Sequence, residues 1–317
     1  MPMISTGTKT LDTLWCGGVP TNVISLLFSI PNLGKTWFCY QLANMCTRPT
    51  SAGGLGKKAL YLDTEGFFFT EETQNLFSGY YKKRWPDCHP DKIEIECIED
   101  IFKLGELFGI QFEILQEDKR VSMTAKFPTA LQKKIATTKG KTQVETSQKD
   151  KDWLEKAPLW NKIKTGEYGL IVIDSLTVPI KSEIPSATQN FPARTSLLQI
   201  LLGACYPMAR RGNVGILMTD HITSNPMSPG YAWGLGNPWG GNNILYYIKH
   251  EFGLYRPLKD QITQYAPDGP RVRRMQRYRF PGIDQATLAV KLEKDRGYVD
   301  LPDGGKAKNA DPDSEGT

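Results

Sequence analysis

The 317-residue sequence has few of the features that mark a zinc-binding, secreted or membrane-spanning protein. Its six cysteines include no C-x-x-C pair, and its three histidines stand far apart at positions 89, 221 and 250, so no zinc site is predicted. No apolar run approaches the roughly 20 residues that a membrane helix needs, and the start lacks the layout of a signal peptide. We therefore expect a cytoplasmic protein whose thiols are reduced and mostly in the core.

A glycine-containing turn lies between an apolar strand, predicted over 23–28, and an apolar helix, predicted over 37–43. Turns in this setting hold nucleotide phosphates with backbone N–H groups, a lysine and a hydroxyl. Serine takes the position of the usual first glycine, which would strain the chain if the backbone there has a positive φ. The alternative interpretation is a turn that only caps a helix. The residues expected to bind ATP are Ser29, Asn32, Leu33, Gly34, Lys35, Thr36 and Trp37.

Two further apolar strands end in acidic residues. The run 169–173 leads to Asp174, and the run 59–62 leads to Asp63 and Glu65. The carboxyl ends of parallel strands meet at one sheet edge, so Asp174 is expected to hold Mg²⁺ together with Thr36, and Glu65 to activate a water molecule. Taken alone, each acid could instead be a helix cap or a solvated residue. Together with the turn, they predict ATP hydrolysis.

The alternation of apolar strands and helices predicts an α/β fold with a twisted, mostly parallel central sheet. Helices are expected on both faces of the sheet, with an antiparallel extension near residues 244–300. One domain is predicted over residues 1–301. A lysine-rich insertion at about 116–164 reads as a mobile segment that could contain a short amphipathic helix, with a solvated surface loop as the alternative, and residues 302–317 read as a disordered tail.

An arginine-rich segment follows near the C-terminus. In an extended strand Arg271, Arg273, Arg277 and Arg279 share one face, and such a row of guanidinium groups would suit a nucleic-acid backbone. An edge strand protected by charge against aggregation is the alternative.

The long loop over 222–243 carries almost no charge and is rich in glycine, proline and aromatic residues. A loop of this length inside a domain is usually functional or disordered. Its aromatic rings could stack on the bases of single-stranded DNA, or they could only fix the loop to the surface. The rings expected to contact DNA are Tyr231, Trp233 and Trp239.

These motifs together resemble the RecA family of strand-exchange ATPases, and most closely the archaeal RadA-type recombinases and their paralogues. The matching stretches span most of the chain apart from the insertion: residues 4–12, 16–19, 29–36, 63–65, 173–177, 218–221, 237–242 and 280–282. The resemblance implies a RecA-like P-loop ATPase core that uses ATP and Mg²⁺. It also implies catalytic roles for Lys35, Glu65 and His221, with His221 sensing the γ-phosphate.

The same resemblance carries expectations about partners. A shorter loop, from Glu183 to Arg194, would face DNA. Phe127-Pro128-Thr129-Ala130 is similar to the F-x-x-A motif that docks onto a recombinase, although it could instead pack on its own domain. The chain starts at the ATPase core without the helical domain that family members use to form filaments, which argues against self-assembly. The family usually has glutamine where His221 stands.

The sequence therefore predicts an ATP-dependent DNA-binding recombinase paralogue that acts on nucleoid DNA in homologous recombination and repair, in an accessory or regulatory role to strand exchange. The alternative is a RecA-like signalling or assembly ATPase that switches protein partners without DNA. A third hypothesis is a binding module that has lost hydrolysis.

Overall fold

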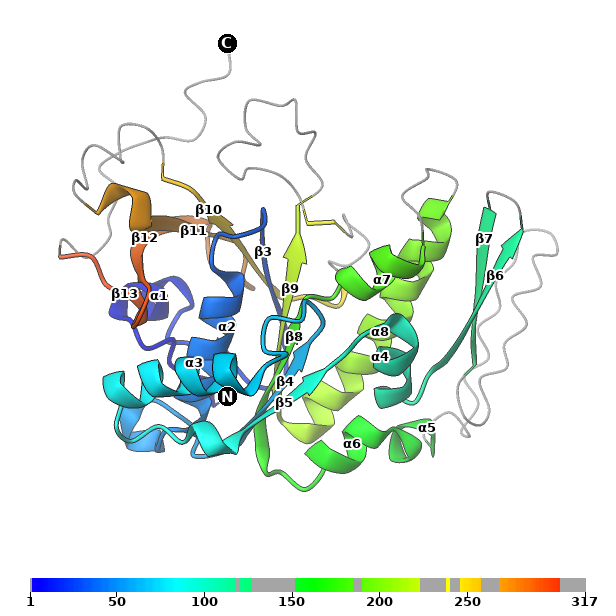
Figure 1. The fold of residues 1–317 in the computed structure, drawn as a ribbon, viewed down its shortest axis with the longest axis horizontal. Coiled ribbons are helices and arrows are strands. Elements are labelled where there is room, and N and C mark those ends of the chain that lie inside the picture. Colours follow the sequence, from blue (N-terminus) through cyan, green and yellow to red (C-terminus); the bar gives the residue numbers. More distant parts are fainter. Residues whose placement is uncertain are drawn as a thin grey trace, which may run out of the picture.

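A computed structural model describes residues 2–117, 120–126, 152–184, 190–222, 238–239, 246–257 and 268–302. Its centre is a large sheet with the strand order β5-β4-β8-β9-β3-β10-β11-β12-β13 (Figure 1). The strands from β5 to β10 are parallel to one another, and β11, β12 and β13 extend the sheet in antiparallel fashion. The predicted α/β fold with an antiparallel extension is confirmed. The strand bounds are β3 (Ile24–Ser29), β4 (Lys58–Asp63), β5 (Ile93–Cys97), β8 (Tyr168–Asp174), β9 (Gly215–His221), β10 (His250–Tyr255), β11 (Val272–Arg279), β12 (Ala286–Glu293) and β13 (Gly297–Val299).

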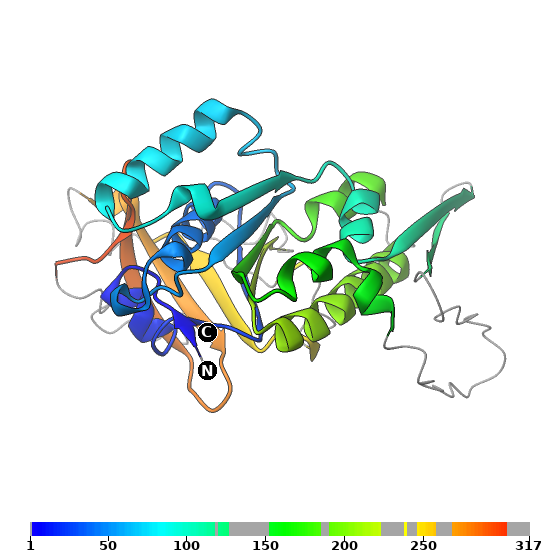
Figure 2. The same cartoon turned by 90° about the horizontal axis from the view of Figure 1, so that it is seen from below.

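Helices cover both faces of this sheet, as Figure 2 shows from below. One face carries α1 (Lys9–Leu14), α2 (Lys35–Thr47) and α3 (Glu71–Arg84); the other carries α4 (Ile101–Leu107), α6 (Pro158–Ile163), α7 (Val178–Glu183) and α8 (Phe191–Gly212). Successive strand residues point to opposite faces, so Leu26 of β3 packs in one core and Leu27 in the other. The central strands are buried on both sides and need no polar face, which explains their continuous apolar runs.

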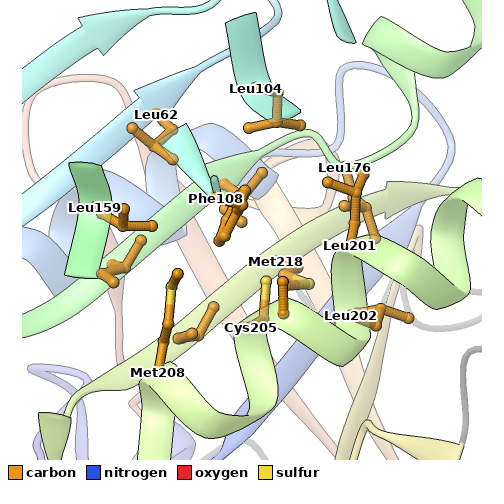
Figure 3. Packing of buried hydrophobic residues seen from close by; sticks show 14 of the residues in the cluster. Leu62, Leu104, Phe108, Leu159, Leu176, Leu201, Leu202, Cys205, Met208 and Met218 are labelled. Carbon is orange, nitrogen blue, oxygen red and sulfur yellow. The ribbon is translucent and has the colours of Figure 1, made fainter. Parts of the chain in front are cut away.

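The core between α8 and the sheet is made of side chains from the helices and from the strands (Figure 3). Cys205 and Met208 of the helix pack with Met218 of β9 and Leu62 of β4, and all four are buried. No helix in the described ranges combines the length and the apolar composition that crossing a membrane requires.

The smaller elements lie at the edges of the domain. A short ribbon joins β1 (Met3–Ile4) to β2 (Val19–Pro20), and a hairpin joins β6 (Gln111–Glu117) to β7 (Arg120–Lys126). The hairpin extends away from the central sheet (Figure 2). Helix α5 (Asp152–Lys156) precedes α6. Short 3-10 turns occupy Thr50–Ala52, Pro90–Lys92 and Gly269–Arg271.

The predicted insertion is corrected at both ends. Its first part forms strand β7, and its last part forms α5 and α6. Leu159, Trp160 and Ile163 of α6 are buried in the main core, because apolar residues at helical spacing form one inward face. Lys162 of the same helix is half-buried and pairs with Glu94 and Glu96 of β5. Residues 127–151, which include the F-x-x-A motif Phe127–Ala130, and the tail from residue 303 lie outside the described residues.

Candidate nucleotide-binding site

Four neighbouring parallel strands end at the edge of the sheet where the predicted site residues lie. The register pairs Ser29 of β3 with His221 of β9, and Asp63 of β4 with Asp174 of β8. Because β9 and β8 also pair directly, the ends of all four strands are adjacent. The structure therefore brings the predicted phosphate loop and the predicted acidic residues to one place.

The loop between β3 and α2 has the backbone of an anion-binding turn. Asn32 and Gly34 adopt positive φ angles of 61° and 111°, and Gly34 is the N-cap of α2. Successive N–H groups of such a turn, at the start of a helix, point toward a bound anion. Ser29 is not among the residues with positive φ, so serine meets no steric strain in the position of the first glycine.

The side chain of Lys35 is folded back onto this loop. Its ammonium donates hydrogen bonds to Ser29 Oγ at 3.2 Å and to the Ile30 carbonyl at 3.4 Å, and the residue is only 5% exposed. Burial lowers the pKa of Lys35, while the nearby carboxylates of Glu65 and Asp174 oppose that effect. The serine that replaces glycine thus supplies a hydroxyl that holds the lysine at the turn.

Asp174 is fully buried and accepts three hydroxyl hydrogen bonds. Thr36 and Tyr61 donate to Oδ2 at 2.7 and 2.6 Å, and Thr219 donates to Oδ1. Burial and the charge of Glu65 raise the pKa of Asp174, and the hydroxyl donors oppose this shift. A threonine hydroxyl beside a carboxylate is a donor set that suits a hard divalent cation.

No group of three or more His, Cys, Asp or Glu residues suited to a metal occurs within the ranges that the structure describes. A Mg²⁺ ion typically takes one or two protein ligands and completes its shell with phosphate oxygens and water. Thr36 and Asp174 fit a cation of that kind, whose site is completed by the ligand.

Asp63 organises the loop that carries Glu65. Its carboxylate accepts backbone hydrogen bonds from Glu65, Gly66 and Phe68 at 3.1, 2.9 and 2.7 Å. Glu65 Oε1 then lies 3.1 Å from His221 Nε2. The hydrogen bond from His221 lowers the pKa of Glu65 despite partial burial, so Glu65 is an ionised carboxylate at neutral pH. His221 Nδ1 is buried and has no hydrogen-bond partner in the described part of the chain.

The end of β9 is hydrogen-bonded to Trp239, in the next described segment of the chain. Asp220, also fully buried, accepts hydrogen bonds from the backbone N–H groups of His221 at 2.6 Å and Trp239 at 2.8 Å. The Trp239 N–H also donates to the His221 carbonyl at 2.9 Å. The indole ring has Lys181 Nζ and Arg194 Cζ each 5.2 Å from its centroid. His221 and Trp239 are therefore joined through a single set of hydrogen bonds.

Sequence reasoning missed several groups at this edge. Tyr61 and Thr219 were not expected to contact Asp174, and Asp220 was not expected to bind Trp239. The strand period offered a signal, because Tyr61 stands two residues before Asp63, and Thr219 two residues before His221, on the same faces of their strands. The sequence pattern does not give the order of the strands in the sheet, and this order places Tyr61 and Thr219 on either side of Asp174.

Comparison with known proteins gives two findings. The Rad51 family model matches residues 1–83, which include the phosphate loop, Glu65 and all of α3 except its last residue. A curated relative, the DNA repair and recombination protein RadA of Aeropyrum pernix, is 25% identical over 276 residues, covering 85% of this chain and 70% of the relative. Both findings make this chain similar to the RadA recombinases of the RecA family, and we call it RadA-like.

In this RadA-like protein two arginines predicted to contact DNA are buried. Arg277, 7% exposed, donates to the carbonyls of Leu14 at 2.7 Å and Asp284 at 2.8 Å. Arg194, 6% exposed, donates twice to the Ile184 carbonyl. Both guanidinium groups are enclosed by the domain and hydrogen-bonded to its own backbone, and a DNA contact of either residue stays a prediction.

The row on β11 is not an open surface. Arg273 and Arg277 share their face with Met275, which is fully buried under the helices. Arg273 Nε donates to the Leu33 carbonyl at 3.0 Å, in the phosphate loop. Arg271 is exposed, so its contact with DNA stays a prediction. Tyr231 and Trp233 of the RadA-like chain lie outside the described residues.

Proposed function

We propose that this RadA-like chain binds ATP with Mg²⁺ at the edge formed by β3, β9, β8 and β4, and hydrolyses it. The N–H groups of the loop from Ser29 to Trp37 would hold the phosphates, and Lys35 would neutralise the β- and γ-oxygens. Thr36 and Asp174 would hold Mg²⁺, which offsets phosphate charge when bound. Glu65 would orient and deprotonate the attacking water. The 2.7 Å hydrogen bond from the half-buried Thr36 hydroxyl to the buried Asp174 carboxylate supports the assignment of these two residues to Mg²⁺.

We further propose that ATP binding controls DNA binding. His221 would contact the γ-phosphate through its side chain, while its backbone carbonyl is bonded to the Trp239 N–H. A shift of His221 on nucleotide binding would then move Trp239 and the loop that carries Tyr231 and Trp233. The hydrogen bonds that join His221, Asp220 and Trp239 are the observation that carries this proposal.

The biological role that fits best is a recombinase paralogue that helps or regulates strand exchange in homologous recombination and repair, at the nucleoid in the cytoplasm. The name of the Aeropyrum pernix relative, a DNA repair and recombination protein, supports that role. Single-stranded DNA is the proposed ligand of the aromatic loop. A second recombinase is the proposed partner of Phe127–Ala130.

The test is a titration of single-stranded DNA with ATP, with ADP and without nucleotide. Coupling of about 1–3 kcal/mol between two sites would make ATP strengthen DNA binding by about 5- to 150-fold. Lys35→Ala should lose both ATP binding and the ATP effect on DNA. Lys103→Ala, at an exposed position of α4, is the matched control and should keep both. Equal DNA affinity of the wild type in all three states would contradict the coupling.

One observation favours the alternative of an assembly ATPase that switches protein partners. Burial of Arg194 and Arg277 removes two cations from the surface that was expected to attract DNA. The rate of ATP turnover with and without single-stranded DNA separates the hypotheses. Stimulation by DNA supports the recombinase paralogue, and unchanged turnover supports the assembly ATPase. ATP binding without any turnover would point to a module that has lost hydrolysis.

A further inference from the structure

Two side chains from the antiparallel extension reach the carbonyl groups of the phosphate loop. Arg273 Nε, on β11, donates to the Leu33 carbonyl at 3.0 Å. The Tyr298 hydroxyl, on β13, lies 3.3 Å from the Leu33 carbonyl and 3.2 Å from the Gly34 carbonyl. The extension is thus bonded to the loop at the two peptides that precede α2.

The direction of these carbonyls fixes the direction of the N–H groups that matter for phosphate binding. In a trans peptide the C=O and the N–H of one peptide unit point to opposite sides. Holding the Leu33 carbonyl toward the extension therefore turns the Gly34 N–H away from it, and holding the Gly34 carbonyl does the same for the Lys35 N–H. Those two N–H groups stand at the start of α2, where a phosphate would be bound.

Tyr298 has little freedom to move from this position. It is fully buried, its N–H donates to Gln41 Oε1 in α2 at 2.7 Å, and its ring packs edge-on against Phe38. A Cβ atom at Gly34 would lie 2.6 Å from the Tyr298 hydroxyl and 2.8 Å from Leu292 Cδ2. The extension is therefore packed directly against the loop, at a residue whose φ of 111° already favours glycine.

Arg273 is held in the same way. Its Nη1 atom donates to the carbonyls of Pro270 and Val272, each at 2.9 Å, which leaves Nε directed at Leu33. Nε and Nη1 of the guanidinium thus donate to backbone carbonyls of the chain. A row of arginines directed at DNA does not account for this arrangement.

We propose that Arg273 and Tyr298 are positioning residues of the phosphate site, which set the affinity of the loop for nucleotide phosphates by fixing the Leu33 and Gly34 peptides. The inference rests on the proposed binding of ATP at this loop. It assigns the antiparallel extension a part in nucleotide binding, although no residue of the extension has to touch the nucleotide.

The first test is Tyr298→Phe, which removes the hydroxyl and keeps the buried ring. Loss of one neutral hydrogen bond corresponds to about a fivefold change, so the affinities for ATP and ADP measured by calorimetry should fall about fivefold. The ³¹P resonance of the bound β-phosphate should also move, which a simple loss of stability does not cause. Tyr255→Phe is the matched control, because the hydroxyl of the buried Tyr255 is hydrogen-bonded to Tyr278 and not to the phosphate loop. This variant should change neither the nucleotide affinities nor the ³¹P resonance.

The second variant is Arg273→Met. We expect weaker ATP binding, with nucleotide-free DNA affinity and its salt dependence unchanged. The DNA measurement separates the two roles of Arg273, because loss of a DNA contact would lower the DNA affinity and its salt dependence, whereas loss of a positioning contact would leave both unchanged. If either variant does not fold, the other decides. Wild-type ATP affinity in the folded variants would overturn the inference. A wild-type chain that does not bind ATP would instead contradict the proposed function.

Discussion

His221 Nε2 lies 3.1 Å from Glu65 Oε1, so the predicted phosphate sensor and the predicted general base are hydrogen-bonded to each other. The bond joins the end of β9 to the loop after β4. Under the proposed function this pair would take part in both hydrolysis and the signal to Trp239.

Replacing Glu65 by glutamine should separate binding from hydrolysis. The amide keeps the size of the side chain but cannot accept a proton, and general-base catalysis typically contributes at least about 100-fold. We expect turnover to fall by at least that factor while ATP affinity stays close to wild type, as measured by steady-state kinetics and calorimetry. Glu71→Gln, at an exposed position of α3, is the control. Full turnover in Glu65→Gln would exclude the assigned role.

Asp174→Asn should remove the effect of Mg²⁺ on nucleotide affinity.

The effect of Asp174→Asn on stability should depend on pH, because the pKa of Asp174 is raised by burial in the folded chain. A raised folded pKa means that the carboxyl contributes stability below its unfolded pKa and loses that contribution as pH rises through the folded pKa. Relative to wild type, the asparagine variant should therefore gain stability as the pH rises above the ordinary aspartate pKa of about 3.9, measured by urea unfolding. A pH-independent difference would contradict this.

Substitution of Arg277 should lower the stability of the fold, whereas substitution of Arg271 should leave stability nearly unchanged. Arg277→Met would leave the Leu14 and Asp284 carbonyls without their charged donor, so we expect a loss of about 3 kcal/mol in the free energy of unfolding. Arg271→Ala, at an exposed position, should change stability by less than about 0.5 kcal/mol. If Arg271 contacts a DNA phosphate, its loss should reduce the slope of log affinity against log salt by about 1. A stable Arg277→Met variant would show that its hydrogen bonds contribute little.

His250 should make the fold sensitive to mild acid. It is buried, stacked on Phe280 at 4.2 Å, and burial lowers its pKa from 6.5 to about 4. Between these values the unfolded chain binds a proton that the folded chain does not, so stability rises with pH across this window. The group should cost about 2 kcal/mol of unfolding free energy on going from about pH 7.5 to pH 5. His250→Gln should lack this component in denaturant melts, and an identical pH profile would refute the assignment.

The sequence was sufficient for β3, β4 and β8 because each of these central strands is a largely apolar run. The run before Asp174 indicated a buried strand, and the carboxyl-edge rule then placed its acid near the phosphate loop. Helix α6 was missed because lysines surround its apolar face, and the composition of the segment outweighed the spacing of Leu159 and Ile163.

The arginine row shows a different limit. The two-residue period of a strand correctly predicts that Arg273 and Arg277 share a face. It does not predict which face of the strand is covered by helices. Here the shared face lies under α1, and Arg277 is bonded to the end of that helix at Leu14. For the same reason, the contacts of Tyr61 and Thr219 with Asp174 required the strand order.

The place of Tyr298 in the chain has a consequence for synthesis. The ribosome releases the N-terminal part of a protein first, and domains fold as their residues emerge. The phosphate loop is therefore translated early, whereas strand β13 emerges among the last described elements. The Leu33 and Gly34 carbonyls acquire their tyrosine partner only when nearly the whole domain has left the exit tunnel. A nascent or prematurely terminated chain would carry the turn without the contacts that complete it.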